Sequence, residues 1–171
     1  MKKMSFLNQG VGQIGYVVEN VDETIRHFYE NFGIGDWSIY TYGAPLLKMM
    51  RRHGEPCEYK SRIALGYLGG SRVEFIQPLE GETVYSEFVA KHGYGVQHLG
   101  IYVPDIEAAL AEARAGGLHV AMEGSGFGLD GDGYFAYLDT EAKFGTTLEL
   151  IQRPLRRHEP ESIYPPVAPV K

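Results

Sequence analysis

The sequence predicts an α+β protein made of two tandem copies of one βαβββ module. Two observations lead to this fold class. A strand-like segment followed by a helical segment occurs twice, and a second pair of similar strand-like segments closes the two halves in the same order. Internal repeats of this kind are typical of architectures that use one supersecondary unit more than once. A match at both ends of each half indicates duplication rather than chance.

The first element of each half is an apolar segment with glycine at its third position. Residues 13–18 (QIGYVV) align with residues 98–103 (HLGIYV). Asn20 in the first half and Asp105 in the second stand where a helix is expected to begin, because their side chains can accept hydrogen bonds from free backbone N–H groups. Apolar residues then recur at helical spacing, and glycine follows the last turn of each predicted helix.

The last element of each half is a second matching pair of segments, residues 70–77 and 145–152. Between the helix and this segment, each half contains two more strand-like segments, which are expected at 37–42, 59–68, 118–122 and 133–139. Each half is therefore expected to contain one strand, one helix and three further strands.

The remaining segments surround and connect the two modules. We expect an N-terminal arm at 1–10, the first module at 11–80, a linking helix within 81–94, the second module at 95–153, and a Pro-rich tail at 154–171. The tail is expected to be extended or bound to a partner. Within the first module, a long loop is expected at 43–58, where the basic residues Lys48, Arg51, Arg52 and His53 gather.

The composition disfavours several classes of function. A net charge of −6 argues against non-specific nucleic-acid binding, which needs a basic surface. No apolar run is long enough to span a bilayer, and polar residues follow the charged start before any apolar segment forms. Cys57 is the only cysteine, so neither an internal disulfide nor a cysteine metal motif is expected. We expect a soluble, cytoplasmic protein without nucleic-acid or membrane partners.

The repeat pairs four polar residues that lie within apolar segments: Gln13 with His98, and Glu74 with Glu149. A carboxylate in such a strand is costly to bury unless its charge is compensated. Strand alternation puts each glutamate on the face opposite its apolar neighbours. If the two sheets curl toward each other, the four side chains converge, and two carboxylates beside an imidazole favour a cation between them. Any one of the four alone is more often an ordinary polar residue, but the symmetric set favours a divalent metal site.

These residues resemble the vicinal oxygen chelate superfamily, whose members pair βαβββ modules into a cupped, partly open mixed β-sheet barrel around a metal. The resemblance covers residues 11–153. The metal ligands of human-type glyoxalase I are similar in type and order to Gln13, Glu74, His98 and Glu149. The segment 86–98 (SEFVAKHGYGVQH) is similar to methylmalonyl-CoA epimerase. That epimerase has histidine where Gln13 stands, and an additional catalytic glutamate near the position of Arg62.

The resemblance implies one divalent ion per chain (Zn, Co, Ni, Mn or Mg), bound by the four paired residues, and a homodimer. It implies an isomerase or epimerase that removes a proton next to a carbonyl through a metal-stabilised enolate, with Glu149 and Glu74 as catalytic carboxylates. The expected substrate is an acyl-CoA or a glutathione thiohemiacetal, and Arg51 and Arg52 in the basic loop are the candidates for binding its phosphates.

Similarity within residues 86–98 favours a methylmalonyl-CoA epimerase-like reaction. A glyoxalase I-like lactoylglutathione lyase is the alternative. A non-catalytic small-molecule-binding or resistance module is a further alternative, although such members usually lack the metal ligands. Gln13 argues against an extradiol-type oxygenase, which needs two histidines and one carboxylate, and nothing in the sequence points to a thiol transferase.

Overall fold

The computed structural model describes residues 3–166, so residues 1–2 and the last part of the predicted tail, 167–171, lie outside the described residues. The first half contains η1 (Phe6–Gln9), β1 (Gln13–Val17), α1 (Val21–Phe32), β2 (Trp37–Tyr42), β3 (Met49–Arg52), β4 (Glu55–Pro56), β5 (Lys60–Leu68) and β6 (Ser71–Glu80). The linking helix α2 (Val84–His92) leads into β7 (Gly95–Tyr102), α3 (Ile106–Ala115), β8 (Val120–Ser125), β9 (Tyr134–Leu138), α4 (Glu141–Phe144), β10 (Thr147–Gln152) and β11 (Ser162–Tyr164).

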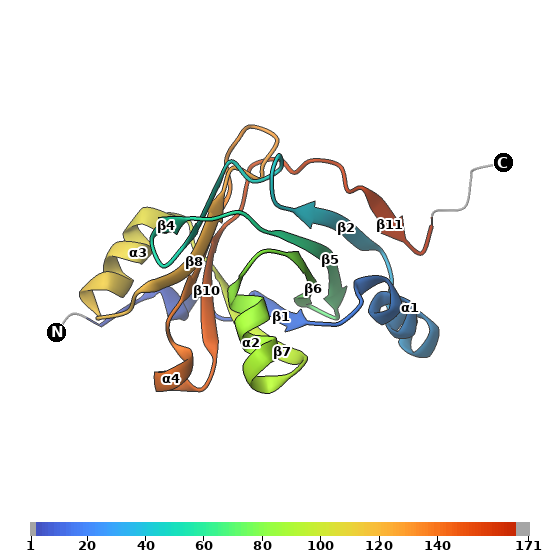
Figure 1. Ribbon diagram of the computed structural model, residues 1–171, viewed down its shortest axis with the longest axis horizontal. Helices are drawn as coiled ribbons and strands as arrows, with labels where there is room; N and C mark the ends of the chain where they lie inside the picture. Colours follow the sequence, from blue (N-terminus) through green and yellow to red (C-terminus); the bar gives the residue numbers. More distant parts are fainter. Residues whose placement is uncertain (1–2, 167–171) are drawn as a thin grey trace.

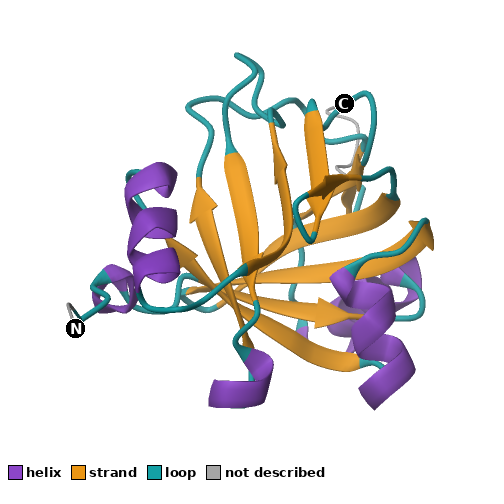
Figure 2. Ribbon diagram, turned by 60° about the vertical axis from the view of Figure 1, so that its left-hand side comes forward, coloured by secondary structure: helices purple, strands orange, loops and turns teal. Residues whose placement is uncertain are grey.

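The strands of residues 3–166 form one mixed sheet in the order β11-β2-β5-β6-β1-β7-β10-β9-β8-β3-β4. At its centre, β1 is parallel to β6 and antiparallel to β7, and β7 is parallel to β10. The sheet is open, with β11 and β4 as its two edges (Figures 1 and 2). The predicted α+β class is confirmed.

The two copies of the module use the same local interactions. The side chain of Asn20 accepts from the N–H of Glu23 at the start of α1, and Asp105 accepts from the N–H of Ala108 at the start of α3, both at 3.0 Å. A glutamine in the last strand of each copy adds a second contact. Gln77 accepts from the first N–H of α1 at 3.1 Å, and Gln152 from the first N–H of α3 at 2.8 Å. These bonds satisfy N–H groups that have no partner within the helix.

The core consists of three apolar clusters. One packs α1 against the first half of the sheet around Trp37 and Phe75, and another packs α3 against the second half around Ile101 and Leu110. The third cluster is shared, because side chains of β2 and β5 meet side chains of β8 and β9 on the same face of the sheet. This shared face carries the candidate site. No helix in the described part of the chain is long and apolar enough to span a membrane.

The prediction of one long loop at 43–58 is wrong. Met49–Arg52 and Glu55–Pro56 form a hairpin, and β3 pairs with β8 of the other half, where Met49 lies opposite Ser125. Strands this short have little preference of their own, and the partner strand that stabilises them lies about seventy residues away in the sequence.

The predicted tail is extended and folds back onto the first half of the chain. Ser162–Tyr164 forms the edge strand β11 beside β2, and the N–H of Glu161 donates to the carbonyl of Ile39 at 2.9 Å. Earlier in the tail, Arg157 forms an isolated bridge with Gly128, and the N–H of Leu129 donates to the carbonyl of Arg156 at 2.9 Å. The segment 153–164, here called the strap, therefore contacts β2 of the first half and the segment between β8 and β9 of the second.

Candidate metal centre

Four adjacent strands bring the predicted site residues together. Gln13 lies on β1, Glu74 on β6, His98 on β7 and Glu149 on β10. The registers relate the two halves by an approximate twofold axis. Gly15 lies opposite both Glu74 and His98, and Gly100 lies opposite both Glu149 and Gln13.

The glycine at the third position of each repeat leaves room for the site residue of the other copy. A Cβ atom on Gly15 would lie 1.8 Å from Cε1 and 2.1 Å from Nε2 of His98. A Cβ atom on Gly100 would lie 2.9 Å from Cβ of Gln13 and 3.2 Å from Oε2 of Glu149. The sequence repeat contained this signal, since both glycines stand two residues after a polar residue of the set.

The four polar atoms form a ring in which nitrogen and oxygen alternate. Nε2 of Gln13 donates to Oε2 of Glu74 at 3.1 Å and to Oε2 of Glu149 at 3.3 Å. Across the ring, Nε2 of His98 lies 3.4 Å from Oε2 of Glu74 and 3.2 Å from Oε2 of Glu149. The two carboxylates therefore occupy opposite corners of the ring.

The site is buried, and its electrostatics favour a positive charge. The four residues are between 0% and 6% exposed. Burial alone lowers the pKa of His98, but its interactions with Glu149 and Glu74 outweigh burial and raise the pKa to about 9. Burial raises the pKa of the Glu149 carboxyl against the opposing charge of His98. Two desolvated carboxylates within 4.8 Å of each other need a cation beside them, which is either the imidazolium or a metal ion.

The donor set fits a divalent ion. Oxygen and imidazole ligands bind such ions at about 2.0–2.2 Å, so neighbouring ligand atoms lie about 3 Å apart. One ligand atom from each of Glu74, His98 and Glu149 lies within 4.8 Å of the others. Nε2 of His98 is buried and makes no well-aligned hydrogen bond within residues 3–166. The side-chain amide of Gln13 can bind an ion through its carbonyl oxygen, which requires the amide group to flip from the orientation described above.

A family model described as the glyoxalase/bleomycin resistance protein/dioxygenase superfamily matches residues 12–137. The chain belongs to this superfamily. The match confirms the resemblance to vicinal oxygen chelate proteins that the repeat and its four polar residues predicted.

Solved structures of the superfamily share the fold. The methylmalonyl-CoA epimerase from Mycobacterium tuberculosis is 20% identical, with a TM-score of 0.60 over 90% of this chain and 93% of that chain. A Streptomyces coelicolor methylmalonyl-CoA epimerase variant in complex with 2-nitronate-propionyl-CoA is 18% identical, with a TM-score of 0.61 over 86% and 96%. A hypothetical protein from Bacillus halodurans C-125 is 20% identical, with a TM-score of 0.59 over 87% and 97%. A comparison with curated proteins finds no match. At these identities the likeness shows the fold alone.

In this superfamily member, the ring opens into a cavity of about 20 Å³, which has room for an ion or about one water molecule. Apolar and aromatic side chains form much of its lining, and the strap adds one guanidinium. The cavity is lined by Gln13, Tyr42, Leu65, Glu74, Phe127, Phe135, Glu149, Ile151 and Arg157.

Neighbouring side chains hold His98 in place. Nδ1 of His98 lies 2.8 Å from Oε1 of Gln97, and the imidazole packs edge-on against Tyr137 with ring centroids 5.1 Å apart. The hydroxyl of Tyr137 lies 2.7 Å from that of Tyr85 on α2. A partner at Nδ1 fixes the tautomer that presents Nε2 to a ligand.

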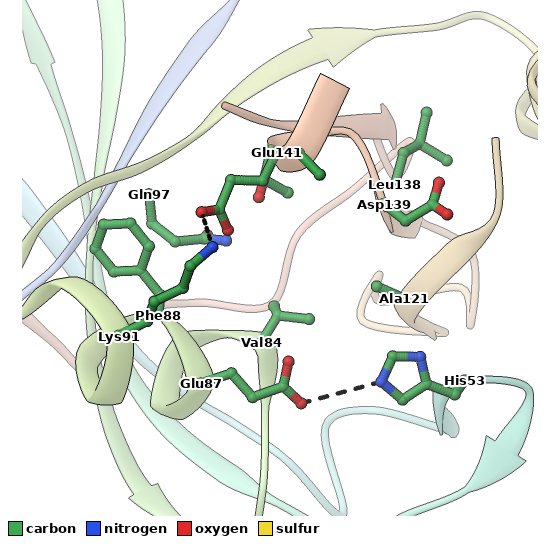
Figure 3. Close-up of a pocket in the computed structure, with 12 residues that line it drawn as sticks. His53, Val84, Glu87, Phe88, Lys91, Gln97, Ala121, Leu138, Asp139 and Glu141 are labelled. Atoms are coloured by element: carbon green, nitrogen blue, oxygen red, sulfur yellow. Dashed lines mark hydrogen bonds and ion pairs between the residues drawn. The ribbon is translucent and has the colours of Figure 1, made fainter. Parts of the chain in front are cut away.

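A second, larger cavity lies between α2 and the strands β8 and β9, with a volume of about 330 Å³ (Figure 3). Gln97 lines it from the side of the metal centre. Lys91 bonds Glu141 at 2.6 Å, Glu87 lies between Arg52 and His53, and Asp139 accepts from the N–H of His119 at 2.7 Å. The pairs Lys91–Glu141 and Glu87–His53 are drawn in Figure 3.

The structure does not bring the predicted phosphate-binding residues to the metal centre. Arg51 and Arg52 lie on β3, and neither lines the 20 Å³ cavity. The guanidinium of Arg52 is bound to Glu82 at 2.7 Å and to Glu87 at 2.6 Å. Sequence reasoning missed Tyr42, Tyr137 and Arg157. Strand alternation within 133–139 carried a signal for Tyr137, whereas Arg157 lies in a Pro-rich segment without periodicity.

Proposed function

We propose that the chain is a divalent-metal-dependent isomerase that removes a proton next to a carbonyl, with chemistry most similar to methylmalonyl-CoA epimerase. The observation that carries the proposal is the placement of Glu74 and Glu149 at opposite corners of one buried ring. If the α-carbon of the substrate lies between the two carboxylates, one of them can remove its proton. The other can then return a proton to the opposite face of the same carbon. Such proton transfer contributes a factor of about 10² to 10⁴ in rate.

Each residue of the ring has a role in this proposal. Gln13, Glu74, His98 and Glu149 hold the ion, which when bound polarises the substrate carbonyl and stabilises the enolate. We take Glu149 as the first candidate for the base and Glu74 as the carboxylate that returns the proton. Leu65, Phe127 and Phe135 keep water away from the reacting carbon.

The solved relatives support the substrate class. One epimerase structure is a complex with 2-nitronate-propionyl-CoA, and another is a complex with methylmalonyl-CoA and NH4+. An acyl-CoA is therefore our first candidate substrate for this chain. Arg51 and Arg52 stay candidates for contacting its phosphates at a distance from the reacting carbon.

One observation favours a glyoxalase I-like lactoylglutathione lyase as the second candidate. Glu74 and Glu149 are the only carboxylates among the residues that line the cavity. Near the place where the epimerases carry an additional glutamate, Arg62 is bound to Asp22 at 2.9 Å and does not line the cavity. The two proposed reactions share proton removal and differ in the substrate that the site accepts.

Hydrogen exchange in D2O tests the proposed function. The metal-reconstituted protein is incubated with methylmalonyl-CoA, other 2-branched acyl-CoAs, or the hemithioacetal of methylglyoxal and glutathione, and the α-hydrogen is followed by NMR. Exchange or epimerisation of an acyl-CoA supports the epimerase, and formation of lactoylglutathione supports the lyase. Tight binding of one of these compounds without exchange would contradict catalysis and favour a non-catalytic binding module.

The expected homodimer and the cytoplasmic location also remain proposals. Light scattering coupled to size-exclusion chromatography tests the first, with a mass of about twice the 19.1 kDa chain as the expected result.

A further inference from the structure

Three arginines near the metal centre lack acidic partners, although the protein has 22 acidic and 16 basic residues. Within residues 3–166, no ion pair is formed by Arg72, Arg153 or Arg157, nor by Arg51 and Arg114, which lie away from the cavity, whereas ion pairs are formed by Arg26, Arg52, Arg62 and Arg156. Nε of Arg72 is buried without a hydrogen-bond partner. A buried guanidinium N–H without an acceptor is costly, so Nε of Arg72 marks a position where an anion would be stabilising.

Each of the three lies over an aromatic ring instead. Arg72 is 5.8 Å from the ring centroid of Tyr67, Arg153 is 5.3 Å from that of Tyr102, and Arg157 is 5.5 Å from that of Phe127. A ring face supports a guanidinium without using its N–H donors. These contacts orient the three side chains while most of the N–H groups stay available to a ligand.

The strand topology places the three arginines at one end of the central strands. Arg72, near the start of β6, lies opposite Gln13 at the start of β1. β7 is antiparallel to β1 and parallel to β10, so Tyr102 and Arg153 reach the same end. Burial raises the pKa of Tyr102, and the charges of both Arg72 and Arg153 oppose this rise.

Arg157 extends from the strap into the cavity itself. Its Nη1 donates to the hydroxyl of Tyr42 at 3.1 Å, and its side chain lines the cavity together with Glu74 and Glu149. Burial raises the pKa of Tyr42 to about 12, and the charges of Arg157 and Arg72 oppose this rise. A bound divalent ion would neutralise the charge of the two carboxylates. The three arginines would then give this end of the site a net positive charge.

We propose that Arg72, Arg153 and Arg157, here called the arginine rim, form a binding subsite for an anionic group of the substrate. The inference rests on the proposed function for the claim that the bound molecule is the substrate. A carboxylate next to the reacting carbon and a phosphate of coenzyme A are the two sources of such a group, and both suit the planar fork of arginine. The neighbouring Arg156 does not belong to the rim, because it is bound to Asp130 at the surface.

Calorimetric titration of the zinc-loaded protein tests the proposal with two probes, methylmalonate and coenzyme A. Arg157→Met, Arg72→Met and Arg153→Met are each compared with the parent, and Arg156→Met is the matched control. We expect at least one probe to bind the parent and the Arg156→Met control with equal affinity. The affinity of the rim variants for that probe should be about 10- to 100-fold lower, which corresponds to the loss of a charge-assisted hydrogen bond. Loss of methylmalonate binding identifies a carboxylate subsite, and loss of coenzyme A binding identifies a phosphate subsite.

Two further readouts separate binding from a structural role of the arginines. Arg157→Lys should recover part of the affinity, and raised salt should weaken the parent more than Arg157→Met, because a charge interaction is screened. The proposal is overturned if the parent binds neither probe, or if the rim variants, with unchanged thermal unfolding, bind as the parent does. Failure of the D2O exchange experiment with intact anion binding would contradict the proposed reaction and leave the subsite standing.

Discussion

Replacing Gly15 with alanine is predicted to displace His98 and to disrupt the candidate metal centre. The added Cβ would lie 1.8, 2.1 and 2.3 Å from three atoms of the imidazole. Because carbon atoms in contact lie about 3.5–4.0 Å apart, the ring has to move by about 1.7 Å. Metal–ligand distances tolerate about 0.2 Å, so His98 no longer reaches the ion.

The magnitude of the effect follows from this displacement. Loss of one of four ligands should lower zinc affinity by at least about 100-fold, since the loss of an outer partner alone costs about 10- to 100-fold. Overpacking costs about 1–3 kcal/mol. For a chain of this size that lowers the melting temperature by about 2–12 °C. Competition titration with a zinc indicator and thermal unfolding of the metal-free protein measure the two effects.

Two other glycines provide matched controls. Gly100→Ala should have a smaller effect of the same kind, because its Cβ would lie 2.9 Å from Gln13 and 3.2 Å from Glu149. Gly70→Ala should behave as the parent, because its Cβ meets nothing within 4 Å and its φ is not positive. Zinc affinity of Gly15→Ala within about threefold of the parent, with unchanged unfolding, would refute the reasoning.

Three further predictions concern the ring itself. Gln13→His should keep zinc bound, because imidazole replaces one neutral ligand with another, whereas Gln13→Leu should weaken binding; equal affinity of the leucine variant and the parent in calorimetry would show that Gln13 is not a ligand. Glu149→Gln should keep the circular dichroism spectrum of the parent but slow α-hydrogen exchange by at least about 10²-fold, and an unchanged rate would assign the base to Glu74 or to another group. Zinc affinity should rise with pH between about 6 and 9, because His98, whose pKa is raised to about 9, must lose its proton before it binds the ion; a flat profile in titrations at several pH values would contradict this.

The sequence predicted those parts of the molecule that the duplication repeats. Gln13, Glu74, His98 and Glu149 could be paired because each lies at an equivalent position of an equivalent strand. The helix starts at Asn20 and Asp105 were predictable for a local reason, since capping depends on residues within one turn.

Features outside the repeat could not be predicted in the same way. The hairpin at 49–56 depends on pairing with β8, and the strap depends on β2 and the segment 126–133, so long-range contacts determine both. Arg51 and Arg52 were conspicuous as a basic cluster, yet Arg52 forms ion pairs with α2 and the residues before it. Arg157 is placed in the cavity by the strap, and only the folded chain shows this position.

Metal analysis of the purified protein, reconstituted with zinc and dialysed, tests the central claim most directly. The account predicts about one divalent ion per chain, and thermal stability that falls when a chelator removes the ion, because an ion that binds the folded chain stabilises it by mass action. The double variant Glu74→Gln, Glu149→Gln should bind no ion under the same conditions. Absence of an ion from the reconstituted parent, with unfolding unchanged by the chelator, would contradict the account.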